Sequence, residues 1–308
     1  MIAATSASKE MGWSMEPLFV CGPTASGKSA AALAICKALG GEIINADAFQ
    51  LYRGLEVLTA APGPADRKAV PHHLYGTIDP VEALDAARYR ALALPLIEEV
   101  ASRRKLPVVV GGSGLYLKFL THEPAALPAA DPALRRHLEA LPRAELLRRL
   151  EERDPVEARR IDRHNPRYLQ RALEVCLLTG RRVSDLRQSF QHASARLRGL
   201  LIEWPPAELE PRIRQRAAAM LDNGAIEEVR RHPELSPTAE KAIGIREIRA
   251  LLAGEIDRRT CEERITVATR RYAKRQRTWF RRERWLRPVA GNAPRDELLR
   301  TAEAPEAL

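Results

Sequence analysis

The sequence lacks long apolar runs and clustered cysteines. No stretch approaches the roughly 18 apolar residues of a membrane-spanning helix. Cysteine is sparse, and the four cysteines show no paired spacing that would indicate a zinc site or a set of disulfides. We therefore expect a reduced, cytoplasmic protein without a membrane segment. A chain of 308 residues is long enough to form one large domain and a smaller one.

Acidic residues are scarce in one segment near the C-terminus. The chain carries a net charge of +10, and residues 269–287 contain nine Lys or Arg residues against the single acid Glu283. We expect a helix over 262–286, on which basic residues spaced by three and four share one face, here called the basic stripe. Its members are Arg270, Lys274, Arg277, Arg281 and Arg284. Like charges at this spacing destabilise an isolated helix, so the stripe favours a polyanionic partner, with an ordinary solvated face as the alternative.

Residues 22–29 form the strongest single motif of the chain. They read GPTASGKS, follow an apolar run and precede an alanine-rich helix, which fits the G-x-x-x-x-G-K-[ST] phosphate loop in its strand–loop–helix setting. Backbone N–H groups and the helix N-terminus would hold phosphates, Lys28 would reach the outer phosphate, and the Ser29 hydroxyl would bind Mg²⁺. The residues assigned to this loop are Gly22, Pro23, Thr24, Ala25, Ser26, Gly27, Lys28 and Ser29. The loop alone does not separate kinases and NTPases from transferases that expel diphosphate.

Alternating strands and helices predict the fold class. The expected strands are 17–21, 41–47 and 106–112, with helical segments at 27–39 and 85–104 between them. This alternation predicts an α/β fold with a parallel sheet flanked by helices. Ligands bind at the C-terminal ends of such strands, where the phosphate loop, Asp47 and residues 111–113 are expected to meet.

The middle of the chain changes character and predicts a helical insertion. Helix starts follow Asp131, Asp154 and Asn165, each of which precedes a proline. The third helix would end at Gly180. Its expected polar face consists of Arg167, Gln170, Arg171 and Glu174. A further strand is expected at 197–204. The predicted domains are a discontinuous phosphate-loop α/β core over 16–125 and 197–290, a helical insertion over 126–196, and disordered tails over 1–15 and 291–308.

Taken together, these stretches resemble the tRNA dimethylallyltransferase family. The motifs that carry the resemblance are GPTASGKS, NADAFQLYRGL, PHHL, VVVGGSGLYL, ADPALR, NPRYLQRALEV, RIRQRAAAML, AIGIRE and TRRYAKRQRTWFRR, which run nearly from Leu18 to Arg287. The resemblance implies that dimethylallyl diphosphate donates its five-carbon group to N6 of the adenosine on the 3′ side of the anticodon (position 37), and that diphosphate leaves. Its partners would be this donor and the anticodon stem-loop of tRNA. We expect a monomer.

The resemblance also implies roles for individual residues. Asp47 matches the catalytic aspartate that accepts a proton from the N6 amine, and Arg216 would contact the diphosphate with Lys28, one helical turn after Arg212. Ser113 stands where threonine is usual, close to the flipped base. The residues that match tRNA-contacting stretches are Asp47, Ala48, Phe49, Gln50, Ser113, Arg135, Gln170, Arg171, Ala172, Leu173, Glu174, Lys241, Ala242, Ile243, Gly244, Ile245, Arg246, Thr269, Arg270, Arg271, Tyr272, Ala273, Lys274, Arg275 and Gln276.

Three positions depart from the family pattern. Leu58 and Ala61 replace a usual glycine and lysine, and Ala48 replaces a common serine. Leucine would be strained at position 58 if the backbone there needed a positive φ. Three alternatives stay open: a phosphate-loop kinase or NTPase, a prenyltransferase acting on free adenine nucleotides, and a non-catalytic RNA-binding protein with a relic phosphate loop.

Overall fold

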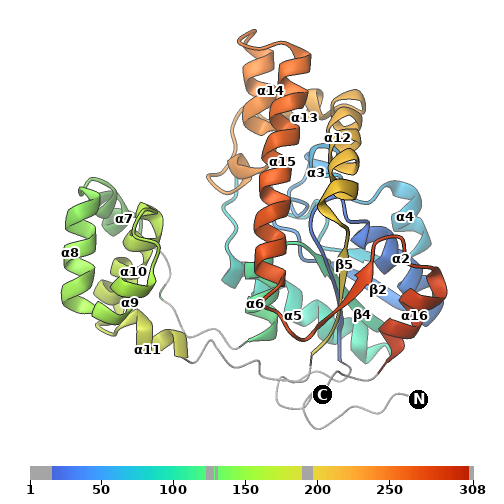
Figure 1. Cartoon of the computed structure of the whole chain (residues 1–308), viewed down its shortest axis with the longest axis horizontal. Coiled ribbons are helices and arrows are strands. Elements are labelled where there is room, and N and C mark those ends of the chain that lie inside the picture. The colour runs from blue at the N-terminus through green and yellow to red at the C-terminus, as the bar shows by residue number, and fades with distance from the viewer. Residues whose placement is uncertain (1–15, 123–127, 129–130, 189–196, 305–308) are drawn as a thin grey trace. The chain divides into compact units, whose positions relative to one another are not determined.

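The computed structural model describes residues 16–122, 128, 131–188 and 197–304 (Figure 1). The chain divides into two compact units. The core unit combines Met1–Thr121 with Ala195–Leu308, and the insertion unit comprises His122–Ser194. The sequence placed the insertion at 126–196, a few residues from this division. No helix among the described residues is both long enough and apolar enough to cross a membrane.

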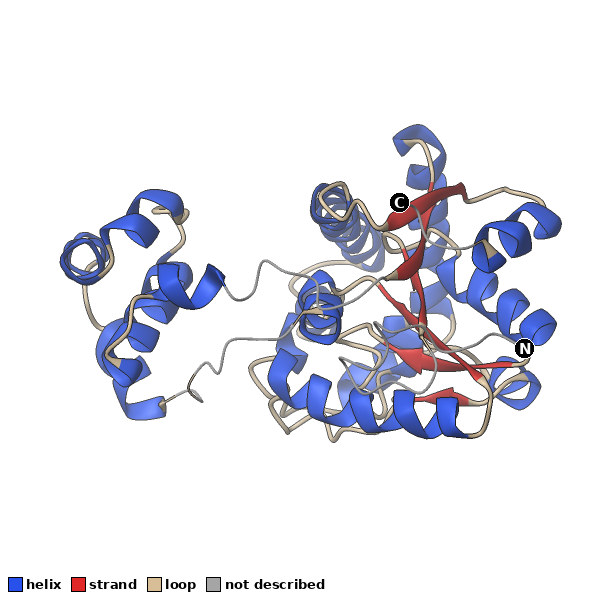
Figure 2. Ribbon diagram, turned by 90° about the horizontal axis from the view of Figure 1, so that it is seen from below, coloured by secondary structure: helices blue, strands red, loops and turns tan. Residues whose placement is uncertain are grey.

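The core unit is built on a six-stranded parallel sheet with the strand order β3-β2-β4-β1-β5-β6 (Figure 2). The strands are β1 Leu18–Cys21, β2 Gly41–Asn45, β3 His72–His73, β4 Leu106–Gly111, β5 Arg198–Glu203 and β6 Leu286–Ala290. The central strand β1 pairs with β4 and β5 on its two sides. Four of these strands were expected from the sequence, whereas β3 and β6 were not. The apolar runs are long because both faces of a parallel sheet are buried.

Helices cover both faces of the sheet, and successive strand residues enter opposite hydrophobic cores (Figure 2). On β1, Phe19 packs into one core, whereas Leu18 and Val20 pack into the other. The helical elements of this unit are α2 Lys28–Leu39, α3 Glu56–Thr59, α4 Pro64–Ala69, α5 Ala86–Ser102, α6 Gly114–Thr121, α12 Pro206–Asp222, α13 Ala225–Arg231, the 3₁₀ helix η1 Ala239–Lys241, α14 Ile245–Leu252, α15 Arg258–Phe280 and α16 Arg295–Glu303.

The long basic helix α15 starts and ends earlier than the sequence predicted. The Asp257 side chain accepts a hydrogen bond from the Thr260 N–H at 2.7 Å and thereby caps the N-terminus. Arg281 is the C-cap residue, and β6 begins soon afterwards at Leu286. Arg284 therefore lies beyond the helix, and the basic stripe is reduced to its other four members.

The expected disorder of the C-terminal tail is wrong for most of its length. Helix α16 packs against α2 and buries Leu298 and Ala302, which are four residues apart and share one helical face. The Arg198 guanidinium also donates to the Ala302 carbonyl at 2.7 Å. Burial of this apolar face provides the free energy that orders the segment. Residues 1–15 and 305–308, the rest of the predicted tails, lie outside the described part of the chain.

The insertion unit is all helical, as the sequence predicted. Its helices are α7 Pro132–Glu139, α8 Arg143–Arg153, α9 Pro155–Arg160, α10 Pro166–Thr179 and α11 Val183–Gln188. The three predicted starts are confirmed, because the side chains of Asp131, Asp154 and Asn165 each accept a backbone N–H at the beginning of α7, α9 and α10. The unit has its own hydrophobic core, which includes Leu150 and Leu169.

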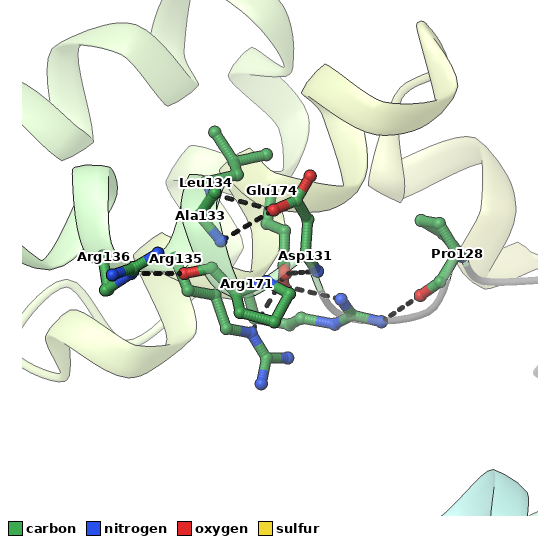
Figure 3. A network of polar contacts seen from close by, with 9 residues as sticks. Pro128, Asp131, Ala133, Leu134, Arg135, Arg136, Arg171 and Glu174 are labelled. Atoms are coloured by element: carbon green, nitrogen blue, oxygen red, sulfur yellow. Dashed lines mark hydrogen bonds and ion pairs between the residues drawn. The ribbon is translucent and has the colours of Figure 1, made fainter.

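Glu174 occupies the centre of a polar network in this unit (Figure 3). The sequence placed it on a solvent-facing side of α10, but the side chain is only 1% exposed. Its Oε1 atom accepts hydrogen bonds from the Asp131 N–H and from Arg135 Nε, both at 3.0 Å, and Oε2 accepts one from Arg171 at 2.6 Å. Arg171 also donates to the Pro128 carbonyl at 3.0 Å. A buried carboxylate thus ties the start of α7 to α10 and fixes two arginines.

We predict that Glu174→Gln lowers stability at neutral pH but has little effect in acid. Burial alone would raise the pKa of Glu174, but hydrogen bonds from Arg171, Arg135 and the Asp131 amide outweigh it and lower the pKa below its usual value. The Glu174 carboxylate of the unfolded chain therefore binds a proton at a higher pH than the carboxylate of the folded protein does. The carboxylate therefore stabilises the fold above about pH 4.5, and this contribution is lost as the pH falls through the lowered folded-state pKa.

The measurement is the unfolding midpoint of the wild type and the variant from pH 3 to pH 7. The expected loss at pH 7 is about 2 kcal/mol, typical of hydrogen bonds to a charged group. Glu152→Gln is the matched control, because Glu152 forms an ion pair with Arg148 on α8 but is 54% exposed. A Glu174→Gln deficit that did not shrink in acid would contradict the assigned role.

Candidate active site

The phosphate loop connects the buried end of β1 to α2. Gly22 is required at the first turn, because a Cβ there would lie 2.6 Å from the Ser26 Oγ atom and 2.7 Å from the Ile202 carbonyl oxygen. Ala25 adopts a left-handed conformation with φ 64°, which is uncommon for a residue other than glycine. Lys28 and Ser29 follow as the first two residues of α2. The loop therefore has the strand–loop–helix setting that its sequence predicted.

Two cations lie beside the loop, the buried Lys28 and the half-buried Arg216. Lys28 is 7% exposed, and burial lowers its pKa, an effect that Asp47 opposes and Arg216 increases. Burial likewise lowers the pKa of Arg216, and Asp47 again opposes the shift. The Arg216 guanidinium donates to the Thr59 carbonyl at 2.8 Å. Two desolvated cations facing one carboxylate leave an excess of positive charge, which favours an anionic ligand.

Asp47 lies in the turn that follows β2. Its N–H donates to the Asn45 Oδ1 atom at 2.8 Å, and its own Oδ1 accepts the Phe49 N–H at 3.1 Å. Asn45 is fully buried and donates to the Asp47 and Leu74 carbonyls. Asp47 therefore has the structural role of a turn residue, and it also interacts electrostatically with the two cations. A single carboxylate with two oxygens can serve both purposes.

Ser113 links this turn to α15. Its Oγ atom accepts the Ala48 N–H at 2.9 Å, so the link uses the backbone of residue 48 and does not need a serine side chain there. Ser113 also forms a side-chain hydrogen bond with Tyr272, whose pKa is raised chiefly by burial. The hydroxyl that the resemblance places near the acceptor base is therefore retained, and it lies near the turn that holds Asp47.

Arg216 lines three cavities, and two of them also contain the predicted catalytic residues Lys28 or Asp47. The larger of these two has a volume of about 550 Å³ and is lined by residues that include Lys28, Ser29, Pro62, His72 and Arg212. The smaller has about 40 Å³, is lined by residues that include Asp47, Thr269 and Tyr272, and has only about the volume of one water molecule. Arg216 borders both cavities. The larger is lined by Gly27, Lys28 and Ser29 of the phosphate loop, and the smaller by Asp47 together with Thr24 of the same loop.

The departures from the family pattern do not strain the site. Leu58 lies inside α3 with a helical backbone, so the positive φ that would exclude leucine does not occur there. Its side chain is 2% exposed, and the Glu228 carboxylate accepts its N–H at 2.8 Å. Ala61 lines the larger cavity, in which Lys28, Arg212 and Arg216 are the cations close to the loop.

The structure divides the predicted tRNA-contacting residues into two groups. Several are buried inside their own unit and serve packing or internal hydrogen bonding in this conformation. These are Gln50, Ala172, Leu173, Glu174, Ala242, Ile245, Thr269, Ala273 and Gln276. Basic members of the same stretches are exposed: Arg135, Lys241, Arg246, Arg270, Arg271, Lys274 and Arg275. Contiguous sequence cannot separate the two groups, because a packed helix buries only one of its faces.

Exposed cations occupy two faces of α15. The basic stripe borders a groove of about 340 Å³ beside α12, where Glu210 approaches Arg270 at 3.4 Å. An acid from another helix therefore balances part of the charge of the stripe. On another face, Arg264 and Arg271 line a cavity of about 840 Å³ together with Arg246 of α14. Arg246 and Arg271 were among the predicted tRNA-contacting residues, whereas Arg264 was not, because its place in this set depends on how α14 packs against α15.

Comparisons with known proteins identify the family of the chain. Residues 50–283 match the model of the IPP transferase family. A protein of Akkermansia muciniphila named tRNA dimethylallyltransferase is 43% identical over 272 residues, which cover 88% of this chain and 92% of the relative. A tRNA isopentenylpyrophosphate transferase of Bacillus halodurans is 32% identical, with a TM-score of 0.67, over 92% of this chain and 93% of that structure.

The fold is shared more widely. The solved structure of a eukaryotic dimethylallyltransferase, described as acting on tRNA, is 24% identical to this chain and superposes with a TM-score of 0.77. The alignment covers 90% of this chain and 74% of that structure. The expected α/β fold is thereby confirmed. The chain belongs to the IPP transferase family, the family of the tRNA dimethylallyltransferases.

Proposed function

We propose that this protein transfers the dimethylallyl group of dimethylallyl diphosphate to N6 of the adenosine on the 3′ side of the tRNA anticodon (position 37), with release of diphosphate. The observation that supports this most directly is the arrangement around Arg216. Arg216 borders a cavity that the phosphate loop lines with Lys28 and Ser29, and it also borders a second, smaller cavity that Asp47 lines. A donor and an acceptor can thus approach one reaction centre from two cavities.

The loop side suits a departing diphosphate. Negative charge builds up on the leaving group as the allylic C–O bond breaks, and preorganised cations stabilise that charge most strongly where water is excluded. Lys28, Arg216 and the loop amides would supply this stabilisation. Ser29 shares the cavity with Lys28, and its hydroxyl fits Mg²⁺, which is commonly held by few protein oxygens together with substrate phosphates. When bound, the ion would add positive charge beside the leaving group.

The other side suits an amine acceptor. The exocyclic amine must lose a proton as the C–N bond forms, and Asp47 would accept it and orient the amine through a hydrogen bond. The cavity beside Asp47 is too small for a purine, so the surrounding side chains must move when a flipped base enters. Ser113 and Tyr272 lie at this side and would border the base.

The same geometry weighs against the alternatives. Nucleotide hydrolysis usually needs a second acid on a neighbouring strand to hold Mg²⁺. Strand β4 is instead followed by Gly112 and Ser113, which offer no carboxylate. A relic loop would have no need to keep the buried Lys28 and the half-buried Arg216 beside Asp47. The exposed cations of α15 favour a nucleic acid over a free nucleotide as the acceptor.

The function is tested by following labelled dimethylallyl diphosphate with tRNA, AMP or no acceptor. We expect the label to enter tRNA alone and ATP to remain intact. Lys28→Ala and Arg216→Ala should each lower turnover by roughly 10²–10³-fold, the usual effect of removing a charge-stabilising donor. Labelling of AMP would favour the free-nucleotide enzyme, and tRNA-stimulated ATP hydrolysis that disappears in Lys28→Ala would favour an NTPase.

A second prediction separates the two roles of Asp47. Asp47→Asn keeps an oxygen that can accept the Phe49 N–H, so the turn survives, but the amide cannot take up a proton. We expect transfer to fall by roughly 10²–10⁴-fold in both Asp47→Asn and Asp47→Ala, as for loss of a positioned base, while donor binding persists. Substantial activity in Asp47→Asn with loss only in Asp47→Ala would assign Asp47 to the turn alone.

A third prediction concerns the RNA surface. If the basic stripe contacts tRNA phosphates, changing Arg270, Lys274, Arg277 and Arg281 to glutamine should weaken tRNA binding whatever the RNA sequence. The slope of log affinity against log salt should become shallower by somewhat under one unit per lost contact, with donor affinity unchanged. Glutamine at Arg246, Arg264 and Arg271 provides the matched variant on the other face. A slope that changed only in this second variant would leave the stripe as a solvated face.

A further inference from the structure

The backbone of the phosphate loop is held from outside by three side chains. The Thr24 N–H donates to the Gln276 Oε1 atom at 2.8 Å, Arg212 Nε donates to the Ala25 carbonyl at 2.9 Å, and the Trp204 indole N–H donates to the Ser26 carbonyl at 2.8 Å. Three successive loop residues thus each receive one contact. We call Gln276, Arg212 and Trp204 the loop clamp.

Gln276 joins two strand ends as well as the loop. It is 5% exposed, and its Nε2 atom donates to the Gly112 carbonyl at 2.9 Å. Residue 112 must be glycine here, because a Cβ would lie 2.2 Å from Gln276 Nε2 and 3.1 Å from the Gly22 carbonyl oxygen. Both polar groups of the Gln276 side-chain amide are therefore hydrogen-bonded, and the side chain is closely packed against Gly112. The resemblance assigned Gln276 to tRNA, but its contacts here are with the donor loop.

The other two members of the loop clamp support each other. The Arg212 guanidinium lies over the Trp204 ring, 4.5 Å from its centroid, and the same arginine passes close to the loop at Gly27. The sequence placed Arg212 one helical turn before Arg216, without a role of its own. In the structure, the Nε–H group of Arg212 donates to the Ala25 carbonyl, whereas Arg216 interacts electrostatically with Asp47.

These contacts oppose the strain in the loop. Ala25 holds a left-handed conformation, which costs about 1 kcal/mol or more for a residue other than glycine and persists only where the surroundings impose it. Hydrogen bonds to the carbonyls of Ala25 and Ser26 fix the orientation of the peptide units that follow them. A loop fixed in this way needs no rearrangement when an anion arrives, and preorganisation of this kind raises affinity.

We propose that the loop clamp positions the phosphate loop for diphosphate, and that Gln276 is a positioning residue for the donor, with no contact to RNA. The proposal rests on the function proposed above. It gives α15 two separate tasks, because Gln276 and Tyr272 lie one turn apart on its inner side, next to the loop and the Asp47 cavity respectively, while exposed cations occupy its other faces.

The test compares the full-length wild type with Gln276→Met, which is similar in length but makes neither hydrogen bond. The probe is inorganic diphosphate with Mg²⁺, followed by calorimetry, and tRNA affinity is measured separately. We expect diphosphate affinity to fall about tenfold, equivalent to one good hydrogen bond, and tRNA affinity to change less than twofold. In turnover assays, the KM for dimethylallyl diphosphate should rise while the KM for tRNA stays constant.

Two further variants make the result specific. Trp204→Phe removes the indole N–H but keeps a ring beneath Arg212, and it should also weaken diphosphate binding without affecting tRNA binding. This second variant carries the test if Gln276→Met fails to fold. Ser102→Ala is the control, because Ser102 lies on α5 away from the site, is exposed, and its hydroxyl donates to the Glu99 carbonyl of its own helix. It should leave both affinities unchanged.

Each other outcome has a definite meaning. Weaker tRNA binding by Gln276→Met with unchanged diphosphate affinity would show that Gln276 serves the RNA and would overturn the proposal. A lowered melting temperature with unchanged diphosphate affinity would reduce Gln276 to a structural role and would overturn it too. If the wild type itself bound no diphosphate, the proposed function would fail and the loop clamp with it. If the wild type and both clamp variants bound diphosphate equally well, the proposed role of the loop clamp would be wrong, but the proposed function would stand.

Discussion

Two cations that are wholly or partly removed from water, the buried Lys28 and the half-buried Arg216, determine the electrostatics of the site at the C-terminal edge of the sheet. A buried ammonium or guanidinium is tolerated only beside negative charge, and Asp47 is the carboxylate that interacts with both. One carboxylate does not neutralise two cations, so the site retains affinity for a further anion. The same electrostatic balance places Asp47 next to the position where a diphosphate would bind, which is where a base for the acceptor is needed.

The arrangement depends on backbone control as much as on charge. Strand ends β1, β2 and β4 lie side by side in the sheet, and each continues into a turn that carries part of the site. Side chains from distant parts of the chain then fix these turns. Ser113 accepts the Ala48 N–H, and Gln276 bridges Thr24 and Gly112. Because α15 supplies Gln276, Tyr272 and the exposed cations, one rigid helix serves the donor loop, the acceptor cavity and the proposed RNA surface.

The insertion unit also contains a buried charged group that fixes neighbouring side chains. Glu174 is a buried carboxylate that satisfies two arginine side chains and a helix N-terminus. Arg135 is nevertheless 47% exposed at its side chain, so part of its guanidinium remains available at the surface. A buried acid that fixes surface arginines limits their rotamers before any ligand arrives, which lowers the entropy lost on binding. In both the core unit and the insertion unit, buried polar groups therefore orient side chains that are exposed or that are proposed to react.

Local sequence determined the elements whose signals lie within a few residues. The phosphate loop, four strands and the helix starts after Asp131, Asp154 and Asn165 follow from short-range patterns, and the motifs identified the family. Periodicity also showed which residues share a helical face. It could not show whether that face meets solvent or protein, because this depends on elements far along the chain. Thr24 and Gln276 are 252 residues apart, and Asp131 and Glu174 are 43 apart. Only tertiary packing could therefore decide that Gln276 and Glu174 point inward, that Arg212 holds the loop backbone, and that α16 is ordered.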